Sequence, residues 1–150
     1  MTRANTVRLD FHSTFDMLDF VHVVSEQITR MAGLDEDARH WVNVAVRESV
    51  INAIKHGNAH DARKRVHVEF TPLDRQDQPP GIVIRVRDEG PGFDPEELPD
   101  PLAPENLLKA SGRGIFLIRS FMDEMALRRM PDGGMEVRMV KRVQAQGQRM

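Results

Sequence analysis

The stretch ESVINAIKHGN, residues 48–58, is the most informative part of this chain. It places a carboxylate, Glu48, and a carboxamide, Asn52, four residues apart, so that they share one face of a helix. Two segments with paired glycines follow in order: DEGPGF at residues 88–93 and SGRGI at residues 111–115. Because glycine turns let a backbone approach phosphates or a purine closely, the three segments together predict a nucleotide site.

Two helices are expected before and through the first of these segments. The first begins at Ser13, which forms a capping-box pattern with Asp16, and Gly33 ends it. The second begins after Asp35, a typical capping residue, and continues until Gly57. The apolar residues spaced for the inner stripe of the first helix are Phe15, Leu18, Val21, Ile28 and Met31.

Alternating apolar residues predict strands around these helices. Residues 7–11 form the first strand, and residues 66–70 and 82–86 form an antiparallel hairpin across a polar, proline-rich connection. Two more strands flank the turn at residues 131–134. Asp88 then lies where the second strand of the first hairpin ends.

The region between the two glycine segments has few signs of regular structure. Residues 95–111 contain four prolines and are longer than most connections in compact domains, so we interpret them as a mobile lid. A third helix is expected to start near Gly114, with apolar residues facing inward. The polar residues 144–150 form a frayed tail.

This order of elements predicts an α+β fold. Strand, two helices, hairpin, lid, helix and two strands give a two-layer α/β sandwich, with helices on one face of a mixed, mostly antiparallel sheet. At 150 residues the chain is expected to form a single domain, residues 1–150.

Composition excludes several classes of function. The formal net charge of −2 with 29% charged residues gives no sequence-wide attraction to nucleic acid or to an anionic membrane. The absence of cysteine excludes disulfides and thiolate chemistry. No window approaches the length of a membrane span and the first residues lack the apolar run of a secretion signal, so a soluble, cytoplasmic protein is expected.

Glu48 and Asn52 suit two tasks in phosphoryl transfer. An asparagine oxygen is a suitable ligand for a hard cation that keeps several waters, such as Mg²⁺. A carboxylate one helical turn earlier can accept a proton from a serine hydroxyl or from water. For an isolated pair, the alternative is two polar side chains on a solvated helix face; the two glycine segments that follow favour the functional interpretation.

Asp88 follows an apolar strand and precedes Gly90 and Gly92. Its carboxylate can accept a hydrogen bond from the amino group of adenine inside a pocket. The two glycines let the chain pass close to the base, and Phe93 can cover it. The alternative is an ordinary turn that closes a strand.

Gly112 and Gly114 precede the third helix, whose first amides are free to meet an anion. They are therefore candidate contacts for a triphosphate. Arg113 can add positive charge beside them, although a solvated position in the lid is an equal alternative.

These segments, in this order, resemble those of the GHKL ATP-binding family, which carries an N box followed by two glycine boxes. Within that family, the size of the chain and the stretches ESVINAIKHGN and SGRGIFLIRSFMDEM resemble the bacterial anti-sigma-factor serine/threonine protein kinases. The resemblance implies the Bergerat ATP-binding fold, with Glu48 as the base and Asn52 on magnesium. The residues expected to contact ATP are Asn52, Asp88, Gly90, Gly92, Phe93, Gly112, Arg113, Gly114 and Ile115.

The resemblance also implies partners. An anti-sigma kinase binds a sigma factor and phosphorylates a small antagonist protein of the STAS type, and such kinases often form homodimers. Two other functions stay open from the sequence: an ATP-sensing binding module that transfers no phosphate, and the ATP-binding domain of a split histidine kinase.

Overall fold

The computed structural model describes residues 5–73, 80–92 and 114–144. In chain order the elements are β1 (Val7–His12), η1 (Phe15–Met17), α1 (Leu18–Met31), α2 (Glu36–Asn52), η2 (Ala53–Gly57), β2 (Arg65–Leu73), β3 (Gly81–Arg87), α4 (Gly114–Phe121), β4 (Glu124–Arg129) and β5 (Met135–Arg142). The expected lid and all but the first residue of the expected tail, Gln144, lie outside the described residues.

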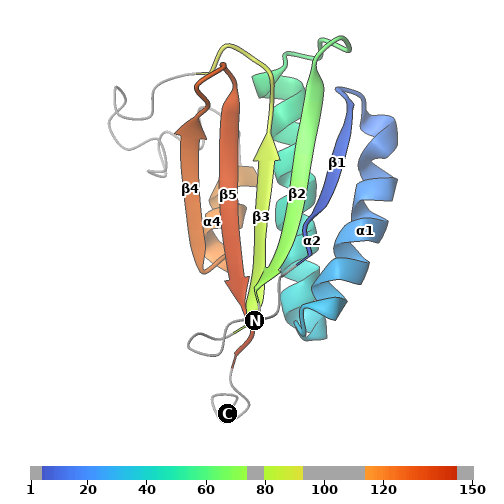
Figure 1. Cartoon of the computed structure of the whole chain (residues 1–150), viewed down its shortest axis with the longest axis vertical. Coiled ribbons are helices and arrows are strands. Elements are labelled where there is room, and N and C mark those ends of the chain that lie inside the picture. Colours follow the sequence, from blue (N-terminus) through green and yellow to red (C-terminus); the bar gives the residue numbers. More distant parts are fainter. Residues whose placement is uncertain (1–4, 74–79, 93–113, 145–150) are drawn as a thin grey trace.

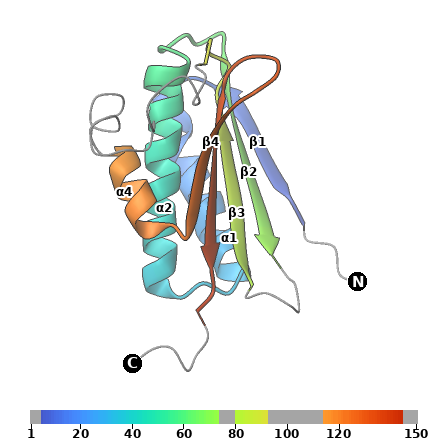
Figure 2. The same cartoon turned by 90° about the vertical axis from the view of Figure 1, so that its left-hand side faces the viewer.

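The strands form one five-stranded sheet in the order β1-β2-β3-β5-β4 (Figure 1). Each neighbouring pair in this sheet is antiparallel. Helices α1, α2 and α4 lie on one side of the sheet, and its other side faces away from them (Figure 2). The expected α+β sandwich with helices on one face is confirmed.

The core lies between this sheet and the helices. Alternation along the strands sends one set of side chains inward, so that Val66, Val68 and Phe70 of β2 are fully buried. The register places Ile84 of β3 opposite Phe70, and Ile84 is fully buried as well. Residues of α2 that complete this core are Val42, Ala45, Val46 and Val50.

Helix α2 begins as the sequence predicts. Asp35 has extended backbone angles, and its carboxylate accepts a hydrogen bond from the Ala38 N–H at 2.8 Å, as an N-cap residue does. At its other end the helix continues as a π-helical turn, η2, up to Gly57. The predicted end of the second helix at Gly57 is therefore confirmed.

The predicted start of the first helix is wrong. Helix α1 begins at Leu18, after the 3₁₀ turn Phe15–Met17, and Ser13 caps neither element. The Ser13 hydroxyl instead donates to the Lys64 carbonyl at 2.9 Å and accepts from the Asn58 side chain at 2.6 Å. These contacts come from distant parts of the chain, so no local pattern could reveal them.

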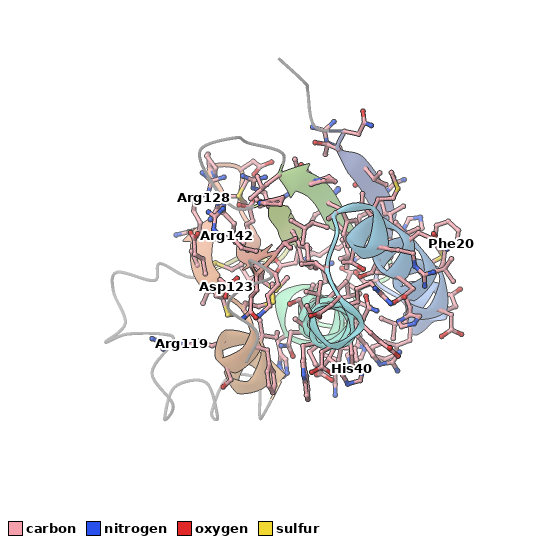
Figure 3. The ribbon with its side chains drawn as sticks, turned by 90° about the horizontal axis from the view of Figure 1, so that it is seen from below. Phe20, His40, Arg119, Asp123, Arg128 and Arg142 are labelled. Atoms are coloured by element: carbon pink, nitrogen blue, oxygen red, sulfur yellow. The ribbon has the colours of Figure 1, made fainter. Side chains whose placement is uncertain are left out.

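The predicted inner stripe of α1 is partly wrong. Leu18, Val21 and Ile28 are buried, but Phe15 and Met31 are exposed, because the first precedes the helix and the second is its last residue. Phe20 is also exposed and points outward from α1 (Figure 3).

Helix α4 begins at Gly114, as the sequence predicts, and packs against α2. The rings of Trp41 from α2 and Phe121 from α4 are stacked, with centroids 3.8 Å apart. Ile118 and Met122 are buried, so they face the core as expected. No helix within the described residues is long and apolar enough to cross a membrane.

Candidate nucleotide-binding site

Three chain segments meet at one end of the sheet, uppermost in Figure 1. They are the end of helix α2 with its π-helical turn, the residues that follow β3, and the turn between β4 and β5. A Cβ atom added at Gly57 would lie 2.0 Å from Asp88, and one added at Gly134 would lie 2.2 Å from the Asp88 carbonyl oxygen. Asp88 therefore lies between the other two segments.

Asp88 is a buried carboxyl group with only 7% of its surface exposed. Its Oδ1 accepts hydrogen bonds from the backbone N–H groups of Gly90, at 3.0 Å, and Met135, at 3.2 Å. Burial raises the pKa of Asp88, and these two hydrogen bonds counteract only part of that effect. Its Oδ2 accepts no hydrogen bond from the described residues, so it is available to a donor from a ligand.

Glycines make this arrangement possible by allowing backbones to touch. A Cβ atom at Gly90 would lie 1.8 Å from the Gly57 carbonyl oxygen, and one at Gly134 would contact the backbone of Asp88. Gly92 has a φ of +69°, in the region that favours glycine. Gly90, expected from the sequence to give room to a base, thus also serves the packing of one chain segment on another.

Asn58 fixes the position of the turn that carries Asp88. This side chain is fully buried, and its Nδ2 donates to the Ser13 hydroxyl and to the Arg65 carbonyl oxygen at 2.9 Å. Its Oδ1 accepts from the Glu89 N–H at 2.7 Å. No role for Asn58 was predicted from the sequence, where its place at the end of the motif, next to a glycine, was the only available signal.

Glu48 and Asn52 lie one turn apart in the last part of α2 and are both half-buried. The Asn52 Nδ2 atom is buried, and no described residue accepts a hydrogen bond from it. A buried amide nitrogen normally has a partner, so this position is suited to a further polar group. The predicted metal residue is thus close to the end of the helix that also presents Gly57 to Asp88.

The residues present fit an adenine nucleotide with Mg²⁺. Asp88 has an acceptor oxygen free for an amino group, and the buried Asn52 Nδ2, which has no partner among the described residues, is an N–H donor that fits a phosphate oxygen. The amide oxygen of Asn52 is the atom that suits a cation. Asn52 would hold the metal, and Asp88 would hold the base.

The second glycine segment is described only in part. Phe93, Gly112 and Arg113 lie outside the described residues. Gly114 and Ile115 are the first two residues of α4, which packs beside the helix that carries Glu48 and Asn52. Their contacts with a nucleotide remain predictions.

Comparisons with known proteins identify a family of ATPase domains. Residues 14–141 match the family described as "Histidine kinase-like ATPase domain". The anti-sigma F factor of Bacillus subtilis (strain 168) is 28% identical over 141 residues, which cover 91% of this chain and 92% of that protein. The serine-protein kinase RsbW of Listeria monocytogenes (EGD-e) is 29% identical over 120 residues, covering 76% of this chain and 72% of that protein.

A solved structure shows a similar fold. It is described as the crystal structure of the RsbU and RsbW domains of Rv1364c from Mycobacterium tuberculosis, and it superposes with a TM-score of 0.61 at 15% identity. The match covers 92% of this chain and 32% of that longer chain. The predicted resemblance to the GHKL family is confirmed, because the family match spans most of the sequence: the chain belongs to the histidine kinase-like ATPase domain family.

Proposed function

We propose that this protein is an ATP-dependent serine/threonine protein kinase that acts as an anti-sigma factor in the cytoplasm. The observation that carries the proposal is the buried Asp88 carboxylate, with one oxygen free for a ligand, beside the end of the helix that bears Glu48 and Asn52. The names of the relatives, an anti-sigma F factor and a serine-protein kinase, support the proposal.

Each site residue has a proposed task. When bound, Mg²⁺-ATP supplies the phosphoryl group and much of the charge neutralisation that its transfer requires. Asp88 selects adenine by accepting a hydrogen bond through Oδ2, and Asn52 holds the metal through its amide oxygen. Glu48 accepts the proton of the substrate serine as the serine oxygen bonds to the γ-phosphorus and the bond from that phosphorus to ADP, the leaving group, breaks.

The proposed partners are those of a switch between two complexes. The substrate is a small antagonist protein of the STAS type, and phosphorylation of its serine adds negative charge that weakens its complex with the kinase. The released kinase then holds a sigma factor. A homodimer is the proposed assembly.

The test is transfer of radiolabelled γ-phosphate from Mg²⁺-ATP to a serine-containing antagonist protein. Glu48→Gln is expected to keep nucleotide binding and to lower the transfer rate by about 10²- to 10⁴-fold, the usual contribution of a general base. Glu36→Gln is a matched control, because Glu36 is exposed in the first turn of the same helix. It should transfer phosphate at the parent rate.

Other outcomes point to other functions. Equal transfer by the parent and by Glu48→Gln would remove Glu48 from the mechanism. Tight nucleotide binding without labelled product would indicate an ATP-sensing binding module. An acid-labile product would indicate a phosphohistidine and hence part of a split histidine kinase, whereas phosphoserine is stable in acid.

A further inference from the structure

A histidine on the outer face of the sheet contacts two carboxylates at once. His67, in β2, lies with Nδ1 2.5 Å from Asp10 Oδ1 and with Nε2 2.8 Å from Glu89 Oε2. Asp10 lies opposite His67 in the register of β1 and β2, and Glu89 directly follows Asp88. The His67 side chain is only 18% exposed, so the protein shields these contacts from much of the solvent.

Both contacts are hydrogen bonds only when the imidazole ring carries two protons. A neutral ring has one N–H donor and one acceptor nitrogen, whereas an ionised carboxylate can only accept. For Glu89, burial raises the pKa, but hydrogen bonds from the Arg65 N–H and from His67 outweigh this effect and lower the pKa overall. After loss of one proton, the unprotonated nitrogen of His67 would face a carboxylate oxygen of Asp10 or Glu89, and both atoms can only accept a hydrogen bond.

The other charges around His67 come from three strands and the turn. The helices of the described part of the chain pack on the opposite face of the sheet, away from the His67 ring (Figure 2). Arg87 lies opposite His67 in β3 and opposes a positive ring, while Asp10 and Glu89 favour it. Among the described residues, the other ionisable neighbours on this face are Arg65 and Glu69 in β2, Arg8 and His12 in β1, and Arg85 in β3.

Glu89 connects this histidine to the candidate nucleotide site. Its backbone N–H donates to Asn58 Oδ1 at 2.7 Å, and its Oε1 accepts from the Arg65 N–H at 2.8 Å. The bond to His67 is the third attachment of the same residue. Of these three, it is the one that a proton on an imidazole ring controls.

We propose that the His67 imidazolium is a positioning residue for nucleotide binding: by holding Glu89 against β2, it keeps Asp88 oriented toward the base. This inference rests on the proposed function, since it assigns the base to Asp88. Deprotonation of His67 frees one of the three attachments of Glu89. The fraction of molecules with Asp88 in the binding orientation then falls, and nucleotide affinity falls with it.

The test compares the affinity for ADP across a range of about pH 5.5 to 8.5 in four proteins, by isothermal titration calorimetry. In the parent, ADP should bind roughly three- to tenfold more weakly at the alkaline end than at the acidic end. His67→Gln should bind with the weaker affinity throughout. The control His22→Gln, at an exposed position in α1, should follow the parent, and it also accounts for protonation of ADP itself.

Glu89→Gln separates positioning from a merely structural role. The glutamine can keep its Oε1 on the Arg65 N–H and offer its amide N–H to Nε2 of a neutral His67, whose other nitrogen still donates to Asp10. This variant should therefore retain tight ADP binding at alkaline pH. If His67 and Glu89 were needed only for stability, Glu89→Gln would not bind ADP tightly at the alkaline pH at which the parent binds it weakly.

If the ADP affinity of the parent depends on pH in the same way as that of His67→Gln, the inference is overturned. If the parent binds no adenine nucleotide at any pH, it is the proposed function that fails. The link itself is then decided without nucleotide by NMR, in which the Glu89 amide signal should titrate together with the His67 ring nitrogens. Independent titration of the two would overturn the link.

Discussion

At the scale of single residues, Asp88 shows how a binding group is kept both buried and available. Two backbone N–H groups occupy its Oδ1, while Gly57 leaves room for its side chain and Gly134 for its backbone carbonyl. Burial raises the pKa of Asp88, because the ionised carboxylate is less favourable in the folded protein than in water. Asp88 therefore stabilises the fold less than a neutral group of the same shape would.

Asp88→Asn should change stability and binding in opposite directions. In the parent, stability falls as pH rises through the unfolded and then the folded pKa of Asp88, because the unfolded chain ionises first. The variant should match the parent in acid. It should be more stable near neutral pH, by about 1.4 kcal/mol for each pKa unit between the two states. Urea unfolding of the parent and of Asp88→Asn, once in acid and once near neutral pH, measures this difference in the free energy of unfolding.

Binding should respond in the other direction. An amide nitrogen in place of Oδ2 would face the adenine amino group, donor against donor, so affinity for ATP should fall by about 1.5–3 kcal/mol. Asp19→Asn is the control, since Asp19 is exposed in α1. An unchanged dissociation constant for ATP would contradict the assignment of Asp88 to the base.

At the scale of the elements, the π-helical turn after α2 sets the distance between the helix and Asp88. Such turns are uncommon and occur often at functional sites. Here the turn ends at Gly57, whose missing side chain leaves the space that the Asp88 carboxylate occupies. The shape of a helix end therefore controls the orientation of a side chain that follows a strand.

Gly57→Ala should disrupt this contact. The added methyl group would lie 2.0 Å from Asp88 Oδ2 and 2.8 Å from its Cβ, so Asp88 must move. We expect a loss of about 1–3 kcal/mol in the free energy of unfolding and a nucleotide affinity lower by about tenfold or more. His56→Ala, at the exposed neighbour, should leave both unchanged. Parent-like affinity in Gly57→Ala would show that the contact is not needed for binding.

Local chemistry determined which elements the sequence could predict. Asp35 caps α2 through its own side chain, and Gly57 ends that helical segment, so both limits were predictable. Ser13 has the same capping chemistry as Asp35, yet its hydroxyl bonds to Lys64 and Asn58. Whether a residue with suitable chemistry caps the helix that follows it therefore depends on tertiary contacts, which no local pattern contains.

The candidate site likewise contains residues that local patterns predicted and residues that they did not. The spacing of Glu48 and Asn52 and the position of Asp88 after a strand followed from helical and strand periodicity. Asn58 and His67 were not found, because their partners lie on other elements: Ser13 and Glu89 for the first, Asp10 and Glu89 for the second. The sheet register brings His67 to Asp10, and the packing of the loops brings Asn58 to its partners.

At the scale of the whole molecule, the sheet order brings the end of β3 beside the turn between β4 and β5. Strand β5 pairs with both β3 and β4, which places Met135 where its N–H reaches Asp88. Alternation of apolar residues predicted these strands but not their order, because the same pattern suits several neighbours. A ligand at this end would lie where the end of α2, the residues after β3 and the turn between β4 and β5 meet.

A ligand bound where these three segments meet should stabilise the whole fold. At a free concentration of a non-hydrolysable ATP analogue near 100 times its dissociation constant, with Mg²⁺, the gain is about 2.7 kcal/mol. For a chain of this size, that corresponds to a rise of roughly 5–10 °C in the unfolding temperature. EDTA should reduce the rise in the parent, and Asn52→Ala should be less sensitive to EDTA. Equal sensitivity would contradict a metal role for Asn52.

The glycine contacts around Asp88 also have a consequence for synthesis of the chain. Gly57 and Gly134 contact Asp88 from segments far apart in the sequence, so the candidate site is incomplete until the hairpin of β4 and β5 has docked. A nascent chain that has already folded its first helices and its first hairpin lacks one wall of the site. Nucleotide capture at this site would therefore begin only after the hairpin of β4 and β5 has left the ribosome.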